Sequence, residues 1–203
     1  MQVRIKKDRV EIDGYVNAVE RDSKILRDRV LGKFIERIRK GAFRRALERN
    51  KDVHVLLNHQ WDRDLGSTAA GNLELHEDAI GLHARATITD AEVIENARNG
   101  DLVGWSFGFD DVPDGVEKTE IDGITHRSVK DLKLYEVSIL NRSKSPAYEG
   151  TLIMARDDEP VFIGDTLEQS VEYIREDEQE TEAEPIDYSA FENIISEMKG
   201  ETK

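Results

Sequence analysis

Residues 103–109 read Val-Gly-Trp-Ser-Phe-Gly-Phe, and large apolar residues alternate there with glycine and serine. Successive side chains of a β-strand point to opposite faces of its sheet, so the run predicts a strand with one bulky apolar face and one bare face. Glycine inside a strand weakens it and often marks a place where a ligand or another segment comes close. Ser106 supplies the hydroxyl on the bare face, and we expect it to meet a partner there.

The segments around this run are mostly short and alternating, which indicates a mainly β fold with a few helices. Strands are expected within residues 3–20, with a turn near Asp13-Gly14, and over 53–59, 73–75, 80–86, 124–129, 132–140 and 151–155. Helical spacing predicts a helix over 24–48, broken near Gly32 and Gly41, and a second over 89–100 with Thr89 or Asp90 as its N-cap.

The charge of the chain is concentrated in its C-terminal part. Residues 1–156 contain 26 Lys and Arg against 27 Asp and Glu, whereas residues 157–203 contain 3 against 16, so nearly all of the net charge of −14 lies in the second segment. This pattern predicts one folded domain over 1–156 and an acidic, largely disordered tail over 157–203 that ends in a short amphipathic helix. The tail argues against direct nucleic-acid binding, because phosphate contacts need lysine and arginine.

The composition also bears on the compartment. The chain contains no cysteine, and it has no apolar run as long as a membrane span. We therefore expect a soluble intracellular protein that does not contact a membrane.

Two polar residues fall on apolar faces of the predicted strands. His59 ends the face of Val55 and Leu57, and Glu136 lies in line with Leu134 on the strand over 132–140. Burying an ionised carboxylate is costly unless it is paired and hydrogen-bonded. Both residues therefore need a partner.

A serine, a histidine and a carboxylate on three strands are the components of nucleophilic acyl transfer. Histidine is the usual base that takes the proton of a serine hydroxyl, and the carboxylate orients the imidazole and stabilises its charged form. This hypothesis makes Ser106 the nucleophile, His59 the base and Glu136 the orienting acid. Each residue also has a plainer interpretation, as a small packing residue, a strand end and a salt-bridged acid, respectively.

Two other kinds of enzyme site are less consistent with the sequence. Residues 104–108 match G-x-S-x-G, the nucleophile elbow of α/β-hydrolases such as small esterases, but that elbow needs a helix directly after the serine, and a polar loop is predicted at 110–115. The five histidines form no close ligand pair, and His76 and His83 are expected on opposite strand faces. We therefore expect neither a metal nor another cofactor.

Four blocks of the sequence together resemble the HK97-type prohead maturation serine proteases of tailed phages, whose fold is similar to that of herpesvirus assemblin. The blocks are GAFRRAL (41–47), LLNHQWDRDLGST (56–68), GWSFGF (104–109) and LYEVSILNRSKSPAY (134–148), and the resemblance runs from about residue 10 to 155. It implies an assemblin-like, closed antiparallel β-barrel surrounded by α-helices.

The resemblance also implies a site and a function. It assigns the base to His59, the nucleophile to Ser106 and the acid to Glu136, with His126 as the alternative third member, because assemblin uses a second histidine there. By analogy, the oxyanion would be held by the backbone near Asn141 and Arg142. The protein would be a serine endopeptidase.

The expected substrate is the scaffolding part of the major capsid protein. The enzyme would cut this segment, and also itself, inside the immature capsid in the host cytoplasm, and self-association into a homo-oligomer is compatible with this role. The alternative is a non-enzymatic assembly scaffold that retains an inactive protease-like barrel.

Overall fold

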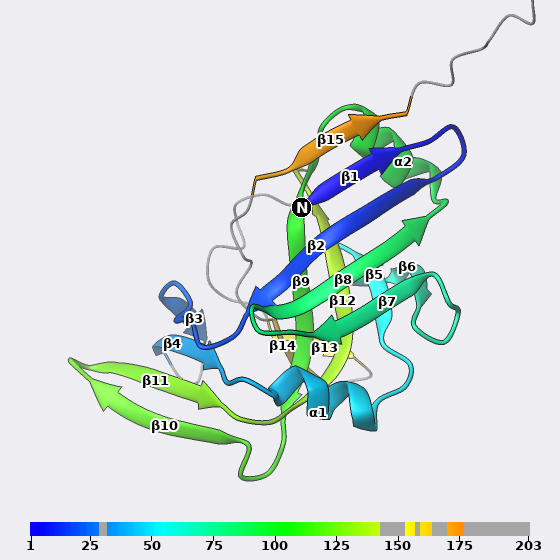
Figure 1. Cartoon of the computed structure of the whole chain (residues 1–203). Coiled ribbons are helices and arrows are strands. Elements are labelled where there is room, and N and C mark those ends of the chain that lie inside the picture. Colours follow the sequence, from blue (N-terminus) through cyan, green and yellow to red (C-terminus); the bar gives the residue numbers. More distant parts are fainter. Residues whose placement is uncertain (29–31, 143–152, 157–158, 164–169, 177–203) are drawn as a thin grey trace, which may run out of the picture.

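The strands of the molecule form three sheets, seen in the computed structural model, which describes residues 1–28, 32–142, 153–156, 159–163 and 170–176 (Figure 1). One sheet has the order β15–β1–β2–β8–β7, with strands at Glu172–Arg175, Gln2–Ile5, Val10–Ala18, Gly81–Ile88 and Leu73–Glu77. A second has the order β10–β11–β4–β3, with strands at Val116–Ile121, Ile124–Val129, Gly32–Ile38 and Leu26–Asp28. The third has the order β13–β14–β9–β12–β5–β6, with strands at Ile153–Arg156, Glu159–Ile163, Leu102–Asp111, Leu132–Asn141, His54–Leu57 and Gln60–Ser67.

The mainly β character is confirmed, but the closed antiparallel barrel is not found among the described residues. Each sheet is open, because its two end strands are not paired with one another. The sheets are also mixed, since β1 pairs with β15, β4 with β11 and β5 with β12 in parallel. Two helices are described, α1 (Ala42–Arg49) and α2 (Ala91–Arg98), and they do not surround a barrel. The assemblin-like arrangement stays a prediction.

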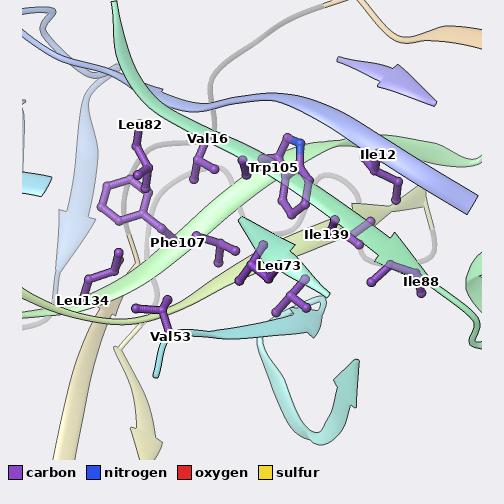
Figure 2. Packing of buried hydrophobic residues seen from close by; sticks show 14 of the residues in the cluster. Ile12, Val16, Val53, Leu73, Leu82, Ile88, Trp105, Phe107, Leu134 and Ile139 are labelled. Carbon is purple, nitrogen blue, oxygen red and sulfur yellow. The ribbon is translucent and has the colours of Figure 1, made fainter. Parts of the chain in front are cut away.

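The core contains apolar residues from both larger sheets (Figure 2). Trp105, Phe107 and Phe109 of β9 are fully buried, which confirms the predicted apolar face, although Val103 is only partly buried. The ring of Phe107 stacks with Phe109 at 5.4 Å and meets Phe43 of α1 edge to face at 5.2 Å. The bulky side of β9 thus fixes the sheet on the core, and its bare side faces away from that core.

The helix expected over 24–48 is wrong in its first two thirds. Residues 26–28 and 32–38 are strands β3 and β4, and the helix begins only at Ala42, after Gly41 with its positive φ of 87°. Phe34 and Ile38 are four residues apart, a spacing that suits one face of a helix and also one face of a strand. Glu36 lies between them on the same buried face, as the alternation of a strand requires. It is buried because it pairs with Arg127 of β11 at 3.0 Å.

Other local expectations are mostly confirmed. The side chain of Asp90 caps α2 by accepting hydrogen bonds from the backbone N–H groups of residues 92 and 93. The hairpin of β7 and β8 forms as predicted, whereas the first turn falls at residues 6–9 instead of Asp13-Gly14. Strands β6, β10, β14 and β15 were not expected. The predicted tail helix lies outside the described residues, and none of the described helices is long and apolar enough to span a bilayer.

Candidate active site

The bare face of β9 is continued by polar side chains of the neighbouring strand β12. The two strands are antiparallel, and their register places Ser106 opposite Ser138 and Gly108 opposite Glu136. Directly opposed residues of an antiparallel pair lie on the same face of the sheet. Ser106, Ser138 and Glu136 therefore share the face that points away from the aromatic side chains of β9.

A β-bulge sets the direction of Glu136. The register shifts between Leu134 and Glu136, so Tyr135 is an extra residue in β12. Leu134 belongs to the buried apolar core, whereas Glu136 faces the opposite side. The expectation that Glu136 lies in line with Leu134 is wrong, because one inserted residue reverses the alternation of side chains.

The strand predicted for His59 is wrong. His59 lies in a tight turn that follows the strand. β5 ends at Leu57 and pairs there with Gln60, the first residue of β6. The two residues between them, Asn58 and His59, have φ angles of 54° and 59°. Two central residues with positive φ are typical of a type I′ hairpin turn, whose twist suits the flanking strands. The turn folds His59 back over the sheet.

Asn58 fastens this turn to the end of β12. Its backbone N–H donates to the carbonyl of Ile139 at 3.0 Å. Its side-chain amide donates to Oδ1 of Asn141 at 3.0 Å and accepts from the backbone N–H of Asn141 at 3.1 Å. Because both asparagines are buried, these bonds hold the turn in a fixed place on the sheet.

The imidazole of His59 contacts the carboxylate of Glu136. Nδ1 of His59 lies 2.7 Å from Oε1 of Glu136, and the two residues are only 7% and 2% exposed. An ionised carboxylate can only accept, so the proton of the neutral imidazole lies on Nδ1 and Nε2 carries a lone pair. The second carboxylate oxygen, Oε2, accepts from Oγ of Ser138 at 2.6 Å. The buried acid thus has the partners that its burial requires.

Gly108 explains why glycine stands beside the serine in β9. A Cβ atom at this position would lie 2.4 Å from Oε1 of Glu136, closer than real Cβ atoms approach. The carboxylate therefore occupies the space that a side chain at residue 108 would fill. Ser106, two residues earlier on the same face, is fully buried beside Ser138.

The sequence of residues 1–161 matches the model of the caudovirus prohead serine protease family. The chain belongs to this family. It is accordingly a serine peptidase with a role in phage prohead maturation. No curated protein and no solved structure shows a significant match.

The structure places the alternative third member of the site away from the face that holds Ser106. His126 lies on β11 of the prohead protease, in the four-stranded sheet, opposite Thr119 and Ile35. Its neighbour there is Asp22. A hydrogen bond from Arg37 is the main cause that lowers the pKa of Asp22, and the nearby charge of His126 lowers it further. The site sheet contains Glu136 at the position next to His59, whereas His126 belongs to another sheet.

The backbone groups expected to hold the oxyanion are already bonded within the protease. The N–H of Asn141 donates to Asn58, and the N–H of Arg142 donates to the carbonyl of Asp101 at 2.9 Å. A donor that stabilises an oxyanion must be available to the substrate oxygen. These two N–H groups are therefore occupied within the protein, and the expectation that the oxyanion is held near Asn141 and Arg142 stays a prediction.

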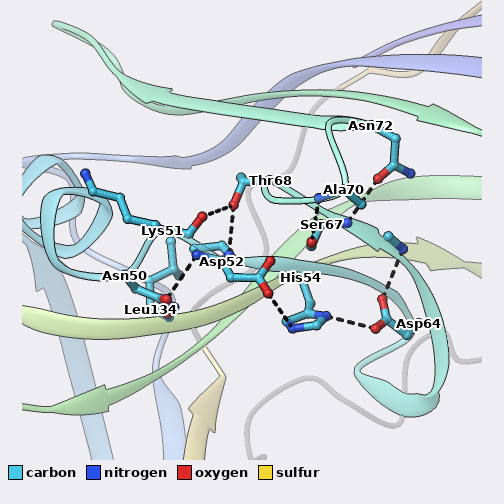
Figure 3. A network of polar contacts seen from close by, with 12 residues as sticks. Asn50, Lys51, Asp52, His54, Asp64, Ser67, Thr68, Ala70, Asn72 and Leu134 are labelled. Carbon is cyan, nitrogen blue, oxygen red and sulfur yellow. Dashed lines mark hydrogen bonds and ion pairs between the residues drawn. The ribbon is translucent and has the colours of Figure 1, made fainter.

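The remaining histidines of the protease have partners outside this site. His54 lies 2.8 Å from Asp64 through Nδ1 and 3.9 Å from Asp52 through Nε2 (Figure 3). His76 and His83 are direct register partners with ring centroids 5.0 Å apart, so they share a face, contrary to expectation. Within the described part of the chain, no group of three or more His, Cys, Asp or Glu residues could hold a metal ion.

Sequence reasoning missed two contributors to the site. Ser138 lies two residues after Glu136, so strand alternation alone places it on the same face, and this signal was available. Asn58 precedes the histidine in a dipeptide without glycine, which gives little indication of a type I′ turn.

Proposed function

We propose that this prohead protease cleaves peptide bonds with a triad of Ser106, His59 and Glu136. The observation on which the proposal rests is the buried 2.7 Å contact between Nδ1 of His59 and Oε1 of Glu136. This contact leaves Nε2 as the basic nitrogen, and Ser106 supplies a hydroxyl on the same sheet face. A carboxylate–imidazole pair next to a serine is the arrangement that activates a hydroxyl for attack.

The chemistry follows from these roles. Oγ of Ser106 attacks the carbonyl carbon of the scissile bond while Nε2 of His59 takes the hydroxyl proton, and the imidazolium is stabilised by the carboxylate of Glu136. When the tetrahedral intermediate collapses, the C–N bond breaks and Nε2 returns the proton to the leaving amine. Water, deprotonated by the same nitrogen, then hydrolyses the acyl-enzyme and releases Ser106.

The proposed substrate is the scaffolding part of the capsid protein, cut within the immature capsid in the host cell, together with the protease itself. Support comes from the family, whose description names a prohead protease. Such a role brings the enzyme into contact with capsid proteins.

The test is co-expression of the full chain with its capsid precursor, followed by mass spectrometry of both. The native protease is expected to yield cleaved precursor, and Ser106→Ala is expected to yield none while it remains folded. Ser67→Ala is the matched control, because Ser67 is also a buried serine but bonds to the N–H of Ala70 in the β6–β7 connection. Normal processing by Ser106→Ala would overturn the proposed nucleophile.

A further inference from the structure

The hydroxyl of Ser138 joins the acid of the site to the main chain of its base. Oγ donates to Oε2 of Glu136 at 2.6 Å and accepts from the backbone N–H of His59 at 3.0 Å. Ser138 is fully buried, and the register places it directly opposite Ser106. It is thus a second serine within the site, with partners that differ from those of a nucleophile.

The hydrogen-bonding capacity of a hydroxyl defines what Ser138 can do here. A serine has one proton to donate and two lone pairs to accept with. The ionised carboxylate of Glu136 only accepts, so it takes the proton, and the N–H of His59 takes one lone pair. With its proton directed to Glu136, Ser138 is arranged to hold its neighbours and not to attack a substrate.

We propose that Ser138 is a positioning residue that fixes the carboxylate of Glu136 and the backbone of His59 in the geometry needed for proton transfer. The inference rests on the proposed triad. The terminal torsion of a glutamate side chain is soft, so a single bond to Oε1 leaves the carboxylate free to rotate. A second bond at Oε2 removes that freedom.

The bond to His59 acts on the other partner. The backbone of His59 lies in the left-handed region, which is uncommon for residues other than glycine. Because the N–H of His59 is held by Ser138, and Asn58 is held by Asn141, the turn cannot swing the imidazole away from the acid. One hydroxyl therefore aligns both members of the pair.

Loss of this hydroxyl has a consequence that a purely structural role would not produce. A hydrogen bond donated to a carboxylate favours its charged form. Without that bond, the carboxylate of Glu136 becomes more basic and stabilises the imidazolium of His59 more strongly. The imidazolium therefore persists to higher pH. Because attack needs the neutral imidazole, the acidic limb of the pH–rate profile moves to higher pH.

The experiment measures the rate at which a fluorophosphonate modifies Ser106 in the full-length protease across pH, with the modified residue identified by mass spectrometry. For Ser138→Ala we expect modification still at Ser106, a rate reduced about 10- to 100-fold, as for loss of a hydrogen bond to a charged group, and an acidic limb shifted to higher pH. Ser67→Ala is expected to keep the native rate and profile.

A second variant keeps the test decisive if Ser138→Ala does not fold. Ser138→Cys preserves the shape of the side chain but replaces a strong donor by a weak one. We expect it to fold and to show a reduced rate with a shifted acidic limb. Thermal unfolding monitored by circular dichroism establishes that each variant is folded.

The outcomes separate this inference from the proposed function. A native protease that is not modified at Ser106 would overturn the triad itself. Modification of native protein at Ser106, combined with the native rate and profile in folded Ser138→Ala or Ser138→Cys, would overturn only the role of Ser138. Modification at Ser138 in the native protein would overturn it as well, because that serine would then be the nucleophile.

Discussion

Replacing Gly108 by alanine tests whether the carboxylate of Glu136 must lie where the structure places it. The added Cβ would stand 2.4 Å from Oε1 and 3.2 Å from Cγ and Cδ of Glu136, whereas ordinary contact begins at 3.4 Å. The oxygen must therefore retreat by about 1 Å to restore a normal contact distance. Oε1 is the atom that accepts from Nδ1 of His59 at 2.7 Å, so the retreat stretches or breaks the contact that orients the base.

The effect on catalysis should be much larger than the effect on stability. A misplacement of about 1 Å in a catalytic group costs roughly 100-fold in rate. Crowding a packed site costs about 1–3 kcal/mol of unfolding free energy, and removal of a strand glycine returns roughly 0.5–1 kcal/mol. Gly108→Ala is therefore expected to fold cooperatively while its turnover falls about 100-fold.

Two quantities are measured for the native protease, Gly108→Ala and Gly123→Ala: the rate at which the capsid precursor is processed and the free energy of unfolding in urea. Gly123 lies in the turn between β10 and β11, has a φ of 73°, and would have nothing within 4 Å of an added Cβ. Alanine there costs about 1–2 kcal/mol of backbone strain and should leave turnover unchanged. Native turnover in Gly108→Ala would refute the reasoning, because it would mean that the carboxylate is not needed at the position described.

Two further predictions concern the carboxylate of Glu136 and the stability of the protein at low pH. Glu136→Gln keeps the shape of the side chain but removes its charge, so turnover should fall on the order of 10⁴-fold, as for loss of an orienting carboxylate; an unchanged rate would exclude Glu136 from the triad. Hydrogen bonds lower the pKa of Asp78 from 3.8 to about 2; the bond donated by the hydroxyl of Tyr15 contributes most, and the backbone N–H groups of Gly81 and Ile80 add to it. Ionised Asp78 therefore contributes stability above pH 4, and this contribution is lost as the pH falls towards 2. In Tyr15→Phe, the free energy of unfolding should fall less steeply between pH 4 and pH 2, as measured by acid unfolding. An unchanged pH dependence would contradict this account.

The faces of β9 could be predicted from the sequence, because large apolar residues alternate there with glycine and serine without interruption. The same alternation failed for β12. The extra residue Tyr135 lies in a run of residues that all suit a strand, and nothing in residues 132–140 marks a bulge. Glu136 was thus assigned to an apolar face, although its true neighbours are Gly108 and Ser138.

The helix predicted over 24–48 failed before Gly41 for a related reason. Apolar residues spaced by four satisfy both a helix and a strand, and the choice depended on Arg127, which is far away in sequence. Arg127 is buried and pairs with Glu36, which is also buried, and with Asp111, which is partly buried; the pair with Glu36 suits β4 as a sheet strand beside β11. Long-range pairing of this kind leaves no local signal, whereas α2 was predictable because its cap, Asp90, is local.

The turn at Asn58-His59 is what makes the site geometrically possible. β5 and β12 are parallel, and their register pairs residue 54 with Glu136. If β5 continued as a strand, residue 59 would stand beside residue 141, about 16 Å along the sheet from Glu136 at 3.3 Å per residue. Reversal of the chain after Leu57 brings the imidazole back over the sheet to the carboxylate instead. The backbone strain of two left-handed residues is therefore tied to the contact on which the proposed chemistry depends, and the bonds from Asn58 to Asn141 and from His59 to Ser138 offset it.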